Sequence, residues 1–105
     1  MSKKQQLILP DDYTPETAQH FVYLLLCADE TLYTGYTTNV PRRLASHQAG
    51  LGARYTRGRR PVTLVAHWAF HTKGEALRAE WAIKRLPRTE KLRLAQLTNP
   101  GESPS

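Results

Sequence analysis

An apolar run at residues 21–27, followed closely by a second β-forming segment, sets the framework of the fold. The run is rich in β-formers and predicts a strand that is buried on both faces. A turn near residues 29–31 leads into a second strand at residues 32–37, and the two strands should pair as a hairpin. A three-residue loop would place Tyr23 and Tyr33 on the same face of the sheet, whereas a four-residue loop would separate them. The sequence alone leaves this register open.

Signals for a helix follow the hairpin. Asn39 is a suitable N-cap, Pro41 fits the first helical turn, and Gly50 can end the helix. Arg43 and His47 lie four residues apart, so they share one edge of this helix. A basic loop at residues 52–60 comes next.

The second half of the chain predicts one strand and two helices. In residues 62–70 the apolar side chains alternate and should share one face: Val62, Leu64, Ala66, Trp68 and Phe70. A capping box of Thr72 and Glu75 opens a helix that ends before Pro87, and a shorter helix then runs to about residue 97. The order β-β-α-β-α-α predicts an α+β fold, in which a small, three-stranded, mostly antiparallel sheet is flanked by helices.

These elements make one domain at residues 20–97. Residues 1–19 lack periodicity and predict a flexible N-terminal tail, and residues 98–105 have the composition of a disordered C-terminal tail. The sequence contains neither an apolar run long enough to cross a membrane nor a secretory signal. Its one cysteine excludes a disulfide framework and a cysteine-based zinc cluster. We therefore expect a cytoplasmic protein with no membrane partner.

The charge indicates a polyanionic partner, of which nucleic acid is the commonest. The formal net charge is +6, and residues 1–20 hold two lysines against three acidic residues, so residues 21–105 carry +7. Four arginines crowd one short segment: Arg54, Arg57, Arg59 and Arg60. Composition alone leaves open that this is merely a soluble basic surface.

Glu80 interrupts the apolar stripe of the second predicted helix. Ala76, Ala79 and Ile83 form that stripe, and Glu80 occupies the position that would continue it. An inward carboxylate costs free energy unless it is paired or bound to a cation. The sequence leaves two interpretations open, a pairing with an arginine or with tyrosine hydroxyls, or a ligand for Mg²⁺.

Five further residues could contribute to a site. Tyr23 and the neighbouring strand's Tyr33 would by default be packing residues, while Gly35, in mid-strand, suggests close approach by a backbone or a ligand. Arg43 can stabilise phosphoryl charge, and His47 can move a proton near neutral pH. A solvated helix face is the plainer interpretation of these last two.

In combination, these positions resemble the GIY-YIG nuclease superfamily. Its first signature strand is matched by residues 21–23, which keep the tyrosine but lack Gly-Ile, and its second by residues 33–35, with threonine for isoleucine. The superfamily's catalytic arginine follows the second tyrosine by ten positions, as Arg43 does. A tyrosine or histidine follows one helical turn later, where His47 stands, and the metal-binding glutamate on the next long helix corresponds to Glu80.

The resemblance covers about residues 20–97. It is strongest to the small stand-alone bacterial members and to the catalytic domain of endonucleases that cut branched DNA. Residues 52–57 look typical of the stand-alone group. The late asparagine of some relatives has no match here.

The resemblance implies a metal-dependent endonuclease that hydrolyses DNA phosphodiester bonds, in DNA repair or recombination. Glu80 would hold one Mg²⁺ or Mn²⁺ ion. Tyr23 and Tyr33 would position or activate the attacking water, His47 would relay a proton, and Arg43 would stabilise the phosphoryl charge. The identity of the general base stays open, because the ordinary pKa of tyrosine, near 10, makes it a poor base.

Binding of DNA, branched or single-stranded DNA included, would rely on phosphate contacts. The residues expected to make them are Tyr36, Arg42, Arg54, Arg57, Arg59, Arg60, Arg78 and Lys84. Three alternatives remain: a catalytically idle nucleic-acid-binding module on the same fold, a nuclease that acts on RNA or single-stranded DNA, and a protein-interaction module. The need for a protein partner and the oligomeric state are also left open.

Overall fold

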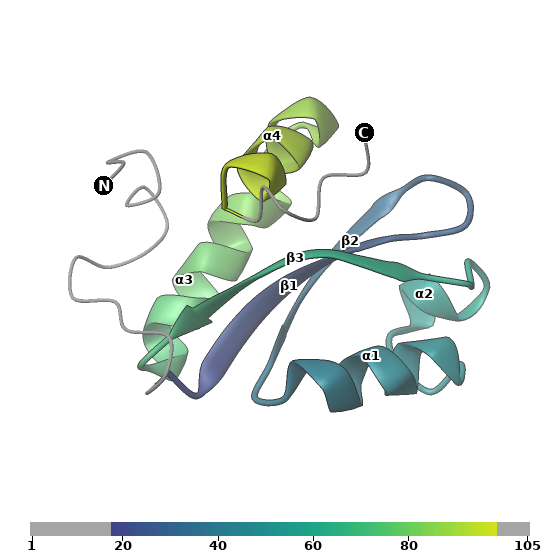
Figure 1. Cartoon of the computed structure of the whole chain (residues 1–105), viewed down its shortest axis with the longest axis horizontal. Helices are drawn as coiled ribbons and strands as arrows, with labels where there is room; N and C mark the ends of the chain where they lie inside the picture. Colours follow the sequence, from purple (N-terminus) through teal and green to yellow (C-terminus); the bar gives the residue numbers. More distant parts are fainter. Residues whose placement is uncertain (1–17, 99–105) are drawn as a thin grey trace.

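The computed structural model describes residues 18–98, in which a three-stranded sheet lies between two pairs of helices (Figure 1). The elements follow the order β1 (His20–Leu26), β2 (Leu32–Thr37), α1 (Val40–Gln48), α2 (Arg54–Arg57), β3 (Thr63–Phe70), α3 (Lys73–Lys84) and α4 (Arg88–Thr98). The predicted α+β class is confirmed. The tails were expected at residues 1–19 and 98–105. Nearly all of both tails, residues 1–17 and 99–105, lies outside the described residues. None of the described helices is long and apolar enough to cross a bilayer.

The sheet has the strand order β2-β1-β3, and both strand pairs are antiparallel. Leu26 pairs with Leu32, so β1 and β2 are joined by a short loop in which Glu30 adopts a positive φ of 68°. Tyr33 pairs with Leu25, two residues after Tyr23 in β1, so the two tyrosines share one sheet face. The register that the sequence left open is the one that brings these tyrosines together.

One prediction about β3 is wrong. Its apolar residues were expected to alternate along a single face, but the pairing with β1 shifts by one residue between Leu24 and Leu25. Leu24 pairs with Ala66 while Leu25 pairs with Leu64, so Val65 is an extra residue in β3. Because of this extra residue, the even-numbered side chains before the bulge point to the opposite face of the sheet from the even-numbered side chains after it.

As a result, β3 contributes to two hydrophobic clusters, one on each face of the sheet. The larger cluster joins the sheet to α3 and α4 and includes Val22, Leu24, Ala66, Trp68, Phe70, Ala76, Ala79, Ile83 and Ala95. The smaller one lies on the face covered by α1 and includes Tyr23, Leu25, Cys27 and Val62, with Leu64, Tyr33 and Leu44 packed against it. The central strand β1 is therefore covered on both faces, as its continuous apolar run predicted.

The helix boundaries agree with the capping residues. The side chain of Asn39 accepts a hydrogen bond from the backbone N–H of Arg42 and begins α1, and Gly50 follows α1 with φ +81°. The hydroxyl of Thr72 accepts from the N–H of Glu75 and begins α3. The segment expected to be a basic loop differs, because its residues 54–57 form the short helix α2.

Candidate active site

The candidate site begins where a side chain of β1 crosses β2. Tyr23 pairs with Gly35, and a Cβ atom added to this glycine would lie 2.4 Å from the hydroxyl oxygen of Tyr23. The phenol of Tyr23 therefore lies across the backbone of β2, where any larger residue would displace it. A close approach was predicted at Gly35, but a side chain of the neighbouring strand makes it.

Two side chains of α1 contact the hydroxyl of Tyr23. This oxygen lies 2.8 Å from Nε2 of His47 and accepts a longer hydrogen bond, of 3.4 Å, from Nε of Arg43. Arg43 and His47 share one edge of α1, as their spacing predicted, and so both reach the same oxygen. Tyr23 is 2% exposed and His47 is fully buried, so their contact lies inside the domain.

Thr56, in α2, contacts the second ring nitrogen of His47. Its Oγ1 lies 2.7 Å from Nδ1 of His47 and donates its proton to the carbonyl oxygen of Ala53 at 3.0 Å. Since the Thr56 proton is used in this way, Nδ1 must be the protonated nitrogen and donate to Thr56. The lone pair of Nε2 is then available to accept the proton of Tyr23. The hydrogen-bond network thus assigns the Nδ1–H tautomer to His47.

Tyr33 completes an aromatic cluster around these residues. Its ring centroid lies 6.2 Å from that of Tyr23 and 5.4 Å from that of His47. On another side it stacks against Tyr55, with the ring centroids 5.8 Å apart and an interplanar angle of 27°. Tyr33 is half-buried and Tyr55 is exposed, so Tyr33 lies between the buried contact and the surface.

Burial keeps both partners of the Tyr23–His47 contact neutral. It raises the pKa of Tyr23 above its ordinary value of 10.0, although the hydrogen bond from Arg43 opposes this change. Burial, followed by the positive charge of Arg43, lowers the pKa of His47 below 6.5. At neutral pH a protonated phenol therefore faces an unprotonated imidazole nitrogen, which accepts its hydrogen bond.

Glu80 lies at the edge of the buried stripe of α3, whose members Ala76, Ala79 and Ile83 are buried as predicted. Its side chain is 18% exposed, and Oε2 lies 3.2 Å from Nζ of Lys84, one helical turn further on. The carboxylate is thus paired with a lysine and not, as the sequence suggested, with an arginine or with tyrosine hydroxyls. Its negative charge also contributes to the raised pKa of Tyr23, so the two groups are within electrostatic reach.

The donor set around Glu80 fits a cation that keeps most of its water ligands. Within residues 18–98, no three His, Cys, Asp or Glu side chains converge as a purely protein-built metal site requires. A partly exposed single carboxylate suits Mg²⁺, which is usually held by one or two carboxylates together with substrate phosphate. Lys84, whose side chain is 54% exposed, could turn away from Glu80 without being buried elsewhere.

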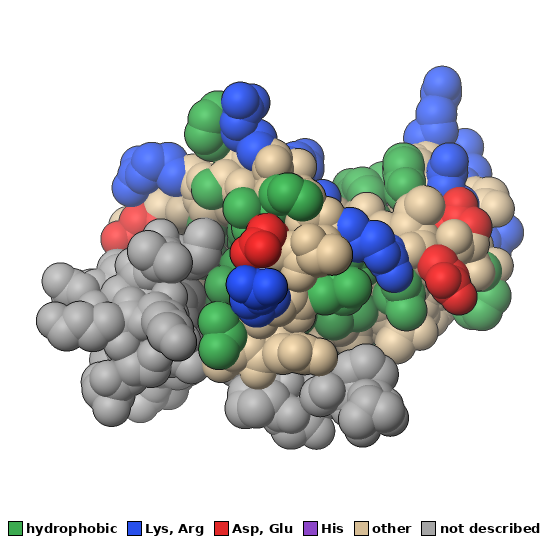
Figure 2. Space-filling view, turned by 90° about the horizontal axis from the view of Figure 1, so that it is seen from above, with side chains coloured by type: hydrophobic (Ala, Val, Ile, Leu, Met, Phe, Trp, Pro, Cys, Tyr) green, Lys and Arg blue, Asp and Glu red, His purple; other side chains and the backbone are tan. Residues whose placement is uncertain are grey.

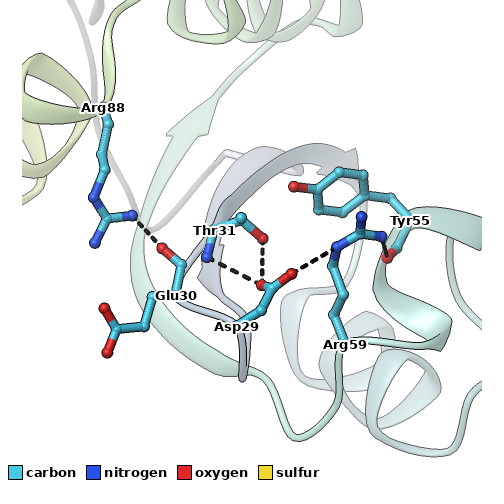
Figure 3. A network of polar contacts seen from close by, with 6 residues as sticks. All are labelled: Asp29, Glu30, Thr31, Tyr55, Arg59 and Arg88. Atoms are coloured by element: carbon cyan, nitrogen blue, oxygen red, sulfur yellow. Dashed lines mark hydrogen bonds and ion pairs between the residues drawn. The ribbon is translucent and has the colours of Figure 1, made fainter.

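Two of the four clustered arginines support the 52–60 segment itself. Arg59 donates to Asp29 Oδ2 at 3.0 Å and to the carbonyl of Tyr55 at 2.7 Å, and its guanidinium lies 4.0 Å above the Tyr55 ring (Figure 3). Arg60 donates to two backbone carbonyls, at the end of α1 and at the end of α2. These arginines connect the segment to the β1–β2 turn and to α1.

The other residues expected to bind nucleic acid differ in their surroundings. Exposed side chains are those of Arg42, Arg54, Arg57, Arg78 and Lys84. An open depression of ≈ 460 Å³ at the end of α1 is lined in part by Arg57 and Arg60. The hydroxyl of Tyr36 lies 2.8 Å from Nδ1 of His20, so this tyrosine has a partner within the protein. Figure 2 shows one face of the molecule, on which Lys and Arg side chains lie beside exposed hydrophobic ones.

Gly52 and Thr56 belong to the site but were not predicted as site residues. A Cβ atom added to Gly52 would lie 2.4 Å from Nδ1 of His47, so this glycine allows the segment to pack against the imidazole. The resemblance of residues 52–57 to the stand-alone nucleases is the signal in the sequence that points to this segment. Their arginines suggested phosphate binding, whereas Gly52 and Thr56 support His47.

Comparison with known proteins shows which family the chain belongs to. Residues 19–93 match the GIY-YIG catalytic domain. The chain is 61% identical over 77 residues to a UPF0213 protein of Natronomonas pharaonis, a match that covers 73% of this chain and 91% of that protein. It is 52% identical over 79 residues to a UPF0213 protein of Staphylococcus haemolyticus, covering 75% of this chain and 96% of that protein. The solution NMR structure of a UPF0213 protein from Bacillus halodurans matches with a TM-score of 0.53 at 52% identity, covering 80% of this chain and 90% of that one.

Proposed function

The chain belongs to the GIY-YIG catalytic domain family, and from this premise we propose that it is a metal-dependent endonuclease that hydrolyses DNA phosphodiester bonds. The observation that supports the proposal best is the buried contact between Tyr23 and His47, with Thr56 behind the imidazole. The three polar side chains are buried and contact one another in a chain of hydrogen bonds, which fixes the orientation of each. A module that only binds nucleic acid through exposed arginines would have no use for this arrangement.

In the proposed reaction, Tyr23 and His47 together act as the general base. Tyr23 alone is a poor base, because its raised pKa keeps the phenol protonated at neutral pH. As the hydroxyl of Tyr23 takes a proton from the attacking water, it passes its own proton to Nε2 of His47, 2.8 Å away. The Nδ1–H group of His47 continues to donate to Thr56, which stabilises the imidazolium that forms.

Arg43 and Tyr33 would assist at the same place. Nε of Arg43 donates to the hydroxyl of Tyr23, so it stabilises negative charge that develops on that oxygen. The remaining N–H groups of its guanidinium can contact an oxygen of the scissile phosphate. Tyr33, half-buried beside Tyr23, can position the attacking water.

Glu80 would hold the divalent cation, Mg²⁺ or Mn²⁺, with water and a phosphate oxygen as the other ligands. When bound, the cation would supply Lewis acidity against the charge that grows on the phosphate. Glu80 would reach the bound phosphate from α3, and Tyr23 and His47 would reach it from β1 and α1. Substrate phosphate would lie between these two groups of residues.

Nucleic acid would bind through phosphate contacts with the exposed basic side chains named above, chiefly Arg54 and Arg57 beside the site. DNA is the proposed substrate, and repair or recombination in the cytoplasm is the proposed setting. Phosphate contacts depend on the charge and shape of the nucleic acid more than on its sugar. RNA is therefore the alternative substrate, to be compared with DNA.

In the test, the purified full chain is incubated with linear, flap, branched and single-stranded DNA and with RNA, and cleavage is measured. Each substrate is tested once with Mg²⁺ or Mn²⁺ and once with chelator. Glu80→Gln removes the charge of the carboxylate at constant size. Glu90→Gln is a matched control, because Glu90 also pairs with a basic residue of its own helix, Arg93, at 3.7 Å. We expect metal-dependent cleavage that is lost in Glu80→Gln and kept in Glu90→Gln. Cleavage that survives in Glu80→Gln would refute the assigned metal ligand, and binding without any cleavage would favour the idle binding module.

A further inference from the structure

The outward face of α3 carries an exposed tryptophan. Trp81 is 63% exposed, whereas the chain's other tryptophan, Trp68, is 2% exposed and lies in the core. The guanidinium of Arg85 lies 4.6 Å from the centroid of the Trp81 ring. Leu77, one helical turn before Trp81, is also exposed, at 41%. A large apolar ring left in water in this way is a feature of binding surfaces.

The neighbours of Trp81 on the helix surface are mostly cationic. Residues three and four positions away are adjacent on a helix. For Trp81 these are Leu77, Arg78, Lys84 and Arg85, of which three carry positive charge. An apolar protein partner would have to remove water from all three cations, while a nucleic acid strand offers them phosphates and offers the ring a base.

The position of Trp81 connects this face to the candidate site. Each residue of an α-helix turns by about 100° relative to the one before it. The buried stripe of α3 faces the sheet, Glu80 lies at one edge of that stripe, and Trp81 lies about 100° further round the helix, on its solvent side. A strand held at Glu80 could therefore continue over the surface of α3 and reach Trp81.

We infer that Trp81 is a stacking platform for an unpaired nucleobase of the bound nucleic acid. Arg85 supports one face of the indole, and a base of the strand stacks on exposed ring surface, while Arg78 and Lys84 contact the flanking phosphates. Bases inside a duplex have no free face to offer, so the site selects strands with unpaired bases. The inference rests on the proposed function in that the strand is the nuclease substrate, but it concerns binding alone.

The test uses the fluorescence of Trp81 in the full chain, without metal and with chelator present so that no cleavage occurs. Three probes are compared at equal phosphate number and low salt: single-stranded oligothymidylate, a strand with the same sugar-phosphate backbone but abasic at every position, and a duplex. We expect oligothymidylate to quench the emission of the wild-type protein and the abasic strand not to quench it. In Trp81→Phe the quenching should disappear, because the remaining tryptophan is buried.

Affinity provides the second measurement. Trp81→Ala should weaken the binding of oligothymidylate by roughly fivefold to a hundredfold, the range of one base–aromatic stack. Binding of the abasic strand should not change, and Trp81→Phe should keep part of the lost affinity. Leu97→Ala, which truncates another exposed hydrophobic side chain on α4, is the control and should behave as wild type.

The outcomes separate this inference from the proposed nuclease activity. Equal binding of oligothymidylate by the wild-type protein and by Trp81→Ala would overturn the stacking site, even if the protein cleaves DNA. The stacking site would also be overturned if Trp81→Ala lost equal affinity for oligothymidylate and for the abasic strand. It would also be overturned by an absence of binding to any probe. Base-dependent quenching in a protein that never cleaves DNA would support the stacking site and refute the nuclease.

Discussion

Replacing Thr56 by valine removes one hydroxyl from the buried contact and changes the shape of the side chain little. The variant deletes the acceptor of the Nδ1–H group of His47 and the donor to the carbonyl of Ala53. Because His47 is fully buried, its Nδ1–H cannot turn to water instead. In the variant this tautomer leaves a buried donor unpaired, so the other tautomer, with the proton on Nε2, becomes competitive. That tautomer cannot accept a proton from Tyr23.

The expected magnitudes follow from the loss of one buried hydrogen-bond partner. An unpaired buried polar group costs about 1–3 kcal/mol, which sets the expected decrease in the free energy of unfolding of Thr56→Val. The same free energy favours the Nδ1–H tautomer in the wild-type protein. In Thr56→Val this preference is lost and the two tautomers become about equally populated, so we expect the rate of DNA cleavage to fall by about twofold. Thr56→Ser keeps the hydroxyl, so it should retain the tautomer and most of the rate, and lose only about 1 kcal/mol of stability with its methyl group.

Three measurements check this reasoning. Nitrogen-15 NMR of the imidazole should show a protonated Nδ1 in the wild-type protein and in Thr56→Ser, and a mixture or the opposite tautomer in Thr56→Val. Cleavage rates are compared at saturating Mg²⁺, and urea unfolding provides the folded fraction of each variant. If Thr56→Val kept the Nδ1–H tautomer and the wild-type cleavage rate, Thr56 would have no part in setting the state of His47.

Three other changes test separate parts of the structure. Gly35→Ala places a Cβ atom 2.4 Å from the hydroxyl of Tyr23 and should cost about 1–3 kcal/mol in urea unfolding and abolish most cleavage. Gly58→Ala, where a Cβ meets nothing within 4 Å, is its control, and equal behaviour of the two variants would contradict the crossing of β2 by Tyr23. The lowered pKa of His47 means that the folded protein disfavours its protonation, so its contribution to stability is complete above pH 6.5 and is lost as the pH falls through the folded-state pKa. The rate of cleavage should also fall as the pH drops below 6.5. A rate that already falls at or above pH 6.5 would contradict this. So would a free energy of unfolding of His47→Gln that decreases with falling pH as steeply as that of the wild-type protein. Glu30→Gly should relieve the positive φ of 68° and raise the unfolding free energy by about 1 kcal/mol, and a loss of stability in urea unfolding would show that no strain is stored there.

The starts of helices α1 and α3, which depend on residues close together in the sequence, were predicted well. Asn39 and Thr72 each cap a helix through the N–H of a residue three positions further on. The edge shared by Arg43 and His47 follows from the helical repeat alone. All of these contacts lie within four residues along the chain, where the sequence order already sets the distance.

The strands show where such local reasoning stops. Continuous apolar character correctly predicted that β1 is covered on both faces. The same approach failed for β3, because alternation assumes a regular ladder and Val65 is an extra residue in the pairing with β1. A bulge forms according to the residues that the strand meets in its partner strand and in the two hydrophobic clusters. The residues of β1 that pair with β3 lie some forty residues away along the chain, so local spacing does not report them.

The sequence by itself determined the family, the order of the elements other than α2, and the positions of Tyr23, Arg43 and His47, because spacing along a helix or a strand places side chains on known sides. Only the tertiary structure decided how these residues work together. The register of β1 with β2 lays the phenol of Tyr23 over Gly35, and the return of residues 52–57 against α1 sets Thr56 on Nδ1 of His47. The state of a buried imidazole depends on which hydrogen-bonding groups surround it. Here those groups come from β1 and α2, 24 and 9 residues from His47 along the chain, and they meet it only when the hydrophobic clusters on the two faces of the sheet bring the chain together.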